Sequence, residues 1–247
     1  MALAPPFLPA PGPVPHDQRP DLDILPADVS GQSERQRILA IYETVRERDI
    51  LTAEHSRRVG IYAQRLARHL GHRRDEIAAF GLAGRIHDAG KSWMPNDILK
   101  KTGELSSAEM AFIRGHTIIG ERFAIAYDLP QFYLHAIRHH HEWFDGSGYP
   151  DNLSGTTIPF VARLLAVVDA FDVITSDRPY RSAADCAHAV TEIRREMGRQ
   201  FDPEIAEAFI SMVARQDPGE FLVVARLCPV PWDPARSGAW YQIVTKY

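Results

Sequence analysis

Residues 87–91 of the chain read His-Asp-Ala-Gly-Lys, and this stretch decides which fold the sequence predicts. Adjacent histidine and aspartate at the end of a helix present a nitrogen ligand and an oxygen ligand to one side, and the glycine then lets the chain turn. An isolated His-Asp pair is more often a helix cap than a metal site. The weight of this pair therefore depends on the residues around it.

Further nitrogen and oxygen donors accompany the pair at intervals along the chain. Most of them lie on or beside segments expected to be helical, so a helical bundle could direct them at one centre. Imidazole and carboxylate ligands without thiolates favour iron, manganese or zinc, and argue against a cysteine-type structural zinc site. The candidate ligands are His55, His87, Asp88, His116, His140, His141 and Asp169.

A surface or core role is the alternative for each histidine taken singly. Asp169 is different because it lies within an apolar helical run, where a carboxylate is costly unless it is paired or bound to a metal. His135 and His139 lie near the candidates and could either support them or face solvent. Histidines without such a context are interpreted as structural: His16, His69, His72 and His188.

Helical spacing of apolar residues runs through most of the chain and predicts an all-α fold. The apolar run after Pro159 could pass for a strand by composition, but its length favours a helix. Ser106 and Glu109 have the spacing of a capping box. The expected helices are residues 33–48, 52–71 and about 75–87, one opened by the box at 106–109, about 130–142, the run after Pro159, and about 202–214.

Both ends of the chain differ from this helical region. Eight of the 18 prolines fall within the first 26 residues, so residues 1–31 are expected to be a disordered tail. Residues 32–50 are then a linking helix, 51–215 the functional domain, and 216–247 an extension of unknown role. Two short β-branched and aromatic segments in this extension could form a hairpin.

Composition narrows the classes of partner and the compartment. A net charge of -4 makes long nucleic acid a poor candidate partner, because binding to it depends on neutralising phosphates. No apolar run is long enough to span a bilayer, and no secretory signal is evident at the start. Cys186 and Cys228 form no close pair in the sequence. We therefore expect a cytoplasmic protein without a membrane partner.

Two further stretches indicate a binding pocket. Residues 145–150, Asp-Gly-Ser-Gly-Tyr-Pro, directly follow the histidine doublet and Glu142, and predict a constrained loop at the mouth of a site. Arg178 and Arg181 follow the apolar helix and could hold a phosphate, although such a pair is more often a solvated helix end.

The motifs HDAGK, HHE, GSGYP and DRPYR, in this order, resemble the HD-GYP family of the HD phosphohydrolase superfamily. The resemblance covers about Leu51 to Phe209. It implies a helical bundle around a metal centre, and an enzyme that hydrolyses cyclic di-GMP to pGpG or GMP. It makes all seven candidates metal ligands, with Asp88 bridging two divalent ions, iron or manganese in preference to zinc. The residues implied to contact the substrate are Lys91, Gly148, Tyr149, Pro150, Arg178 and Arg181.

One departure from the family pattern bears on the product. Some members carry a glutamate four residues before the first histidine ligand, which supports a third metal, and here that position is Leu51. The resemblance therefore implies a two-metal centre and leaves the second hydrolytic step open. A metal-activated water would attack the phosphorus, with Asp88 and Lys91 as catalytic residues. Arg181 stands where relatives can have lysine, and the charge is kept.

Several alternatives stay open from the sequence alone. The chain could hydrolyse another nucleotide, since the loop motif does not specify guanine. It could instead be a silent effector that binds a cyclic dinucleotide or a regulatory protein partner. The helix expected at 33–48 could pair with a second copy to form a homodimer, or pack onto its own domain.

Overall fold

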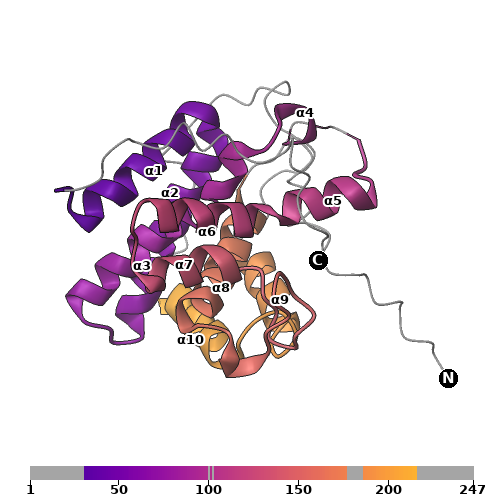
Figure 1. The fold of residues 1–247 in the computed structure, drawn as a ribbon. Coiled ribbons are helices and arrows are strands. Elements are labelled where there is room, and N and C mark those ends of the chain that lie inside the picture. The colour runs from indigo at the N-terminus through magenta and orange to yellow at the C-terminus, as the bar shows by residue number, and fades with distance from the viewer. Residues whose placement is uncertain (1–30, 100, 102, 177–185, 216–247) are drawn as a thin grey trace.

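The computed structural model describes residues 31–99, 101, 103–176 and 186–215. Within these ranges the chain forms α-helices and short 3-10 helices and contains no β-strand, which confirms the predicted all-α class (Figure 1). The expected N-terminal tail, apart from Gly31, lies outside the described residues. The expected hairpin within residues 216–247 lies outside them as well.

The helices follow one another through short connections. None of those in the described part of the chain is long and apolar enough to cross a membrane. In chain order they are α1 Glu34–Arg48, α2 Ile50–His69, α3 Arg74–Ile86, the 3-10 helix η3 Ala89–Trp93, α4 Asn96–Leu99, α5 Ser107–Arg114, α6 His116–Ala126, α7 Gln131–His139, the 3-10 helix η4 Gly155–Thr157, α8 Phe160–Thr175, α9 Cys186–Arg195 and α10 Pro203–Arg215.

Side-chain caps explain where several helices begin. The predicted capping box of α5 is confirmed, because the Ser106 hydroxyl accepts from the Glu109 N–H and the Glu109 carboxylate accepts from the Ser106 N–H. Asp49 caps α2 by accepting from the Leu51 N–H at 3.0 Å. Helix α2 ends before Gly71, whose φ of +83° suits glycine.

Two details of the helix prediction change. The sequence predicts that this helix reaches about Glu142, but α7 ends at His139, with His140 as its C-cap residue. Pro130 is the N-cap residue of α7 and not part of its first turn. Helices α6 and α9 were not predicted as separate elements.

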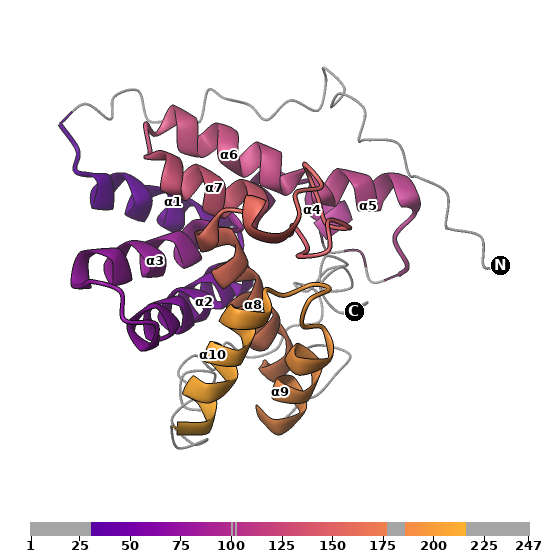
Figure 2. The same cartoon turned by 90° about the horizontal axis from the view of Figure 1, so that it is seen from below.

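The hydrophobic core lies between α2, α3 and α8, with α10 against α8 and α2. Tyr62, Phe171 and Phe209 meet there edge to face, with ring centroids 5.0–5.3 Å apart. Helices α4 and α5 lie at the opposite end of the molecule from α10 in both views (Figures 1 and 2). A smaller apolar cluster covers that end, where Met94, Ile113 and Phe123 pack together.

Helix α1 uses its apolar face within its own chain. Ile38, Ile41, Tyr42 and Val45 are buried in the main core, against α2, α3 and η3. Of the two interpretations of this helix, packing onto its own domain is confirmed. A homodimer would have to use another surface and stays a prediction.

Two close backbone contacts bring the ligand-bearing helices together. A Cβ on Gly84 of α3 would lie 2.7 Å from the Cα of Gly60 in α2, so only glycine permits this spacing. A Cβ on Gly90 would collide with the backbone carbonyl of His116. The first contact places α3 beside His55, and the second places the His87-Asp88 pair beside the start of α6.

Candidate metal centre

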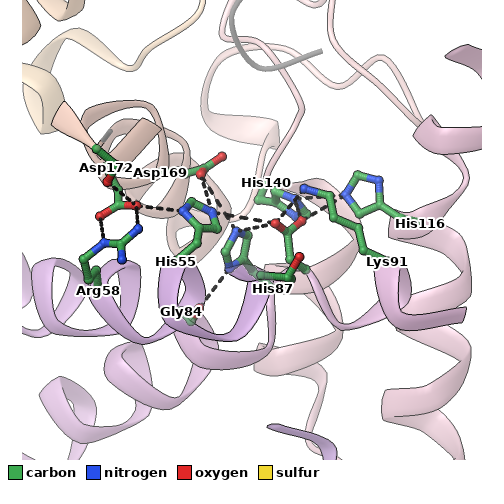
Figure 3. A network of polar contacts seen from close by, with 12 residues as sticks. His55, Arg58, Gly84, His87, Lys91, His116, His140, Asp169 and Asp172 are labelled. Atoms are coloured by element: carbon green, nitrogen blue, oxygen red, sulfur yellow. Dashed lines mark hydrogen bonds and ion pairs between the residues drawn. The ribbon is translucent and has the colours of Figure 1, made fainter. Parts of the chain in front are cut away.

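All seven predicted ligands converge on the centre of the bundle. Figure 3 labels five of them: His55, His87, His116, His140 and Asp169. His55 comes from α2, the His87-Asp88 pair from the end of α3, and His116 from the start of α6. The His140-His141 doublet follows α7, and Asp169 lies within α8. These side chains are almost completely buried, apart from His141, which is partly exposed.

The donor atoms fall into two groups that share Asp88. One group is formed by His55, His87 and Asp88, and the other by Asp88, His116, His140 and His141. Within each group the donor atoms lie within 4.8 Å of one another. A carboxylate common to two such groups is in the place of a bridging ligand.

On the His55 side, the carboxylates lie next to the imidazole Nε2 atoms. His55 Nε2 is 3.0 Å from Asp169 Oδ1 and 3.7 Å from Asp88 Oδ2. His87 Nε2 is 3.4 Å from the same Asp88 oxygen and 3.9 Å from Asp169 Oδ1. Asp169 therefore lies beside this group, and its role as a ligand stays a prediction.

On the other side, the second oxygen of Asp88 faces two histidines. Asp88 Oδ1 is 3.3 Å from His116 Nε2 and 3.6 Å from His140 Nε2, and these two nitrogens are 3.4 Å apart. The His141 ring lies next to both, with its centroid 4.1 Å from that of His140 and 5.1 Å from that of His116.

Buried donor atoms without partners show that the site fits a metal. Among the described residues, His87 Nε2 and Asp88 Oδ1 are buried and make no hydrogen bond. Buried polar atoms are otherwise almost always satisfied, so buried atoms without partners at one centre need an explanation. Divalent cations would accept their lone pairs, and an imidazole-carboxylate set suits iron, manganese or zinc.

In three of the histidines, the hydrogen bond of Nδ1 determines that Nε2 faces the centre. The Nδ1 atoms of His87, His116 and His140 lie 2.7–2.8 Å from backbone carbonyl oxygens. Because a carbonyl only accepts, each Nδ1 carries the proton and Nε2 carries the lone pair. This is how protein metal sites orient their histidines.

Burial keeps most of these rings neutral. It lowers the pKa of His87 to about 4 and lowers the pKa of His116, His140 and, to a greater extent, His141. Burial also acts on His55, but hydrogen bonds to Asp169 and Asp172 outweigh it and raise this pKa to about 9. A cation at the His55 side therefore competes with a proton.

Lys91 is a buried cation directly at the centre. Its Nζ donates to Asp88 Oδ2 at 2.6 Å. Burial opposes the ionisation of Asp88, but Lys91 and the neighbouring histidines outweigh it and hold the pKa of Asp88 well below its usual value. Asp88 is thus ionised and accepts a hydrogen bond from the buried Lys91.

The loop of residues 145–155 covers the His141 side. The Tyr149 ring stacks on His141 with centroids 4.9 Å apart, and the Arg114 guanidinium lies 5.0 Å from the Tyr149 ring centre. A Cβ on Gly148 would collide with the backbone of Trp143, so this position requires glycine. The predicted Gly148-Tyr149-Pro150 motif therefore lies beside the metal centre, whereas Arg178 and Arg181 lie outside the described residues.

Neither His135 nor His139 belongs to the two donor groups. His139 Nε2 instead lies 2.9 Å from Asp151 Oδ2 and helps to hold the 145–155 loop. The structural role predicted for His72 also fits, since its ring packs against Phe80 and Phe160.

Sequence reasoning missed three residues at the site. Asp172 lies one turn after Asp169, is completely buried, and contacts His55. The burial argument made for Asp169 applies equally to Asp172 and could have found it. Arg58 lies one turn after His55, in a stretch that resembles the family, but no role was assigned to it from the sequence; it pairs with Asp172. Arg114 lies over Tyr149, and no signal in the sequence singled it out.

The chain is similar in sequence to known proteins. A cyclic di-GMP phosphodiesterase of Thermotoga maritima is 36% identical over 168 residues, which are 67% of this chain and 45% of the relative. The cyclic di-GMP phosphodiesterase response regulator RpfG of Xanthomonas campestris is 34% identical, covering 72% of this chain and 48% of the relative. The chain thus spans about half the length of these curated relatives.

The fold also matches a solved structure. The crystal structure of a cyclic GMP-AMP-specific phosphodiesterase of Vibrio cholerae (V-cGAP3) superimposes with a TM-score of 0.55 at 18% identity, over 84% of this chain and 57% of that one. The family model described as HD domain matches residues 40–205, well over half of the chain. The resemblance drawn from the motifs is thereby confirmed, and the chain belongs to the HD domain family.

Proposed function

We propose that this chain is a metal-dependent phosphodiesterase that hydrolyses cyclic di-GMP to linear pGpG. The observation that carries the proposal is Asp88, whose two oxygens face two separate groups of histidines. Relatives with about a third of their residues in common are cyclic di-GMP phosphodiesterases by name.

Two divalent ions held by these groups would activate a water as a nucleophile near neutral pH. We favour iron or manganese over zinc. The chain's own residues hold Nε2 lone pairs towards the centre, keep Asp88 ionised, and exclude bulk water through burial. Lys91 supplies a positive charge beside Asp88, and a preorganised charge stabilises the negative charge that develops on phosphate.

The Tyr149 ring stacks on His141 at the rim of the site, and the Arg114 guanidinium over this ring adds a positive charge suited to an anionic substrate. Leu51 precedes His55 by one turn of α2 and offers no ligand atom. We therefore expect hydrolysis to stop at pGpG. Arg178 and Arg181 stay predicted phosphate contacts.

Metal analysis combined with a product assay tests the proposal. The full chain, purified anaerobically, is expected to hold about two ions and to release pGpG from cyclic di-GMP. Asp88→Ala removes a shared ligand worth several kcal/mol of transition-state stabilisation, so we expect a loss of about a thousandfold or more. Asp88→Asn repeats the test with the shape retained, and Asp75→Ala, an exposed residue of α3, is the matched control.

Three outcomes separate the alternatives. Tight binding of cyclic di-GMP without turnover under iron, manganese or zinc would make the chain an effector and refute the enzyme. Preferential cleavage of 3′3′-cGAMP would retain the diesterase and correct its substrate. Further conversion of pGpG to GMP would refute the argument from Leu51.

A further inference from the structure

The histidines of the centre are oriented in two different ways. His87, His116 and His140 each donate from Nδ1 to the backbone carbonyl three residues earlier, at Gly84, Ile113 and Ile137. His55 Nδ1 instead lies 2.8 Å from the Oδ2 atom of Asp172, a side chain 117 residues away (Figure 3).

The position of each residue in its helix explains this difference. His87 and His140 are the C-cap residues of α3 and α7, and His116 directly follows the end of α5, so carbonyls of a last turn remain available to them. His55 lies well inside α2, Ile50–His69, where the neighbouring carbonyls accept hydrogen bonds within the helix. Its ring must be oriented by a side chain.

Asp172 is itself held in place by a third residue. Arg58 donates from Nε to Asp172 Oδ1 at 2.7 Å and from Nη2 to Asp172 Oδ2 at 2.9 Å. Asp172 is completely buried, and the Arg58 side chain is 11% exposed. A bidentate arginine fixes both the charge and the plane of the carboxylate, which in turn fixes the plane of the His55 ring.

We infer that Asp172, held by Arg58, is the positioning residue of His55 and sets the metal affinity of the His55 side of the centre separately from the His116 side. A carboxylate that receives Nδ1–H raises the basicity of the ligating Nε2 atom and restricts the ring to one orientation. On the His116 side, His116 and His140 are oriented by backbone carbonyls, and no contact joins them to Asp172 among the described residues. The inference rests on the proposed function only in that both sides bind an ion.

Titration of the metal-depleted full chain with Mn²⁺ tests this. The native chain is expected to bind two ions. In Asp172→Asn, one ion binds as in the native chain and the other binds about 10–100-fold more weakly. His55→Ala is the benchmark and should weaken the same single ion. Arg57→Gln is the matched control, because Arg57 is adjacent on α2 and pairs with Glu54.

The single variant leaves Arg58 partly buried beside a neutral amide, which can destabilise the fold for reasons unrelated to metal. The double variant Arg58→Gln with Asp172→Asn removes both charges and restores folding without restoring the orientation of His55. We expect it to bind the second ion as weakly as Asp172→Asn does. Arg58→Lys, which keeps a cation near Asp172, should weaken that ion less.

The outcomes are distinct from those for the proposed function, since the titration requires no substrate. Two ions of native affinity in folded Asp172→Asn or in the double variant would overturn the inference. Equal weakening of both ions would overturn it as well, and so would a native chain that binds fewer than two ions. Two ions in the native chain without hydrolysis would refute the enzyme and leave this inference standing.

Discussion

The metal centre and the 145–155 loop use the same kinds of side chain, histidines and carboxylates, in opposite ways. At the centre, His87 Nε2 and Asp88 Oδ1 are buried and make no hydrogen bond among the described residues. In the loop, Asp151 accepts from Arg138 at 2.7 and 2.8 Å and contacts His139. A cluster of histidines and carboxylates is therefore not by itself evidence of a ligand site.

Glu142, directly beside the predicted ligands, is a buried carboxylate whose oxygens both accept hydrogen bonds. Its carboxylate is buried and accepts from the backbone N–H groups of Asp151 at 2.6 Å and Leu153 at 3.0 Å. It follows the His140-His141 doublet in the chain, yet it belongs to neither donor group. Atoms with partners build the scaffold, whereas buried atoms without partners indicate where a ligand binds.

Of the experiments that distinguish the metal centre from the loop, metal removal should change the stability of the folded chain most. A ligand at about a thousand times its Kd stabilises the folded state by about 4 kcal/mol. For a chain of this size that corresponds to a fall of about 10 °C in the melting temperature on chelation. Scanning calorimetry with and without a chelator, followed by Mn²⁺ reloading, measures it. Complete loss of metal with an unchanged midpoint would contradict the assignment of the centre.

Acid should destabilise the metal-free chain through the same residues. Burial lowers the pKa of His87 to about 4, and lowers those of His116, His140 and His141, below the unfolded value of 6.5. Between pH 6.5 and 4 the unfolded chain therefore binds more protons, and stability falls as the pH falls. His55, with a pKa raised to about 9, has the opposite sign, and its contribution is lost as the pH rises from 6.5 to 9.

Urea unfolding of the chelated protein at pH 4.5, 6.5 and 8.5 checks this expectation, with the greatest stability at the middle value. A flat profile between pH 4.5 and 6.5 would show that the buried rings do not stay neutral. Reloading with Mn²⁺ at pH 6.5 is the control, because bound metal favours the neutral rings.

The smallest effect should come from a substitution that weakens the anchoring of the 145–155 loop. Glu142→Gln replaces one carboxylate oxygen by an amide group that cannot accept from a backbone N–H, at a cost of about 1–3 kcal/mol. We expect the KM for cyclic di-GMP to rise more than kcat falls, with two ions still bound. Steady-state kinetics and metal analysis measure both, and Glu207→Gln on the exposed face of α10 is the control. Loss of an ion before any change in KM would place Glu142 among the metal-binding residues.

Much of the helical arrangement could be predicted from local patterns. The capping box at Ser106 and the apolar spacing within 33–48 and 52–71 are short-range signals, and the corresponding helices begin and end close to the expected residues. Helix α6 was missed as a separate element, because its apolar residues are not confined to one face. Its packing between η3 and α7, and not its own periodicity, explains its position.

The sequence by itself predicted the ligand chemistry: seven candidate donors were named from residue type and motif order. Only the tertiary structure decided how six of them divide into two groups around Asp88, with Asp169 beside the His55 group, and that Asp172 contacts His55 Nδ1. The physical reason is that capping and periodicity act within a few residues. Which nitrogen faces a metal depends instead on helix ends and on contacts such as that between α2 and α8, which form only when the bundle packs.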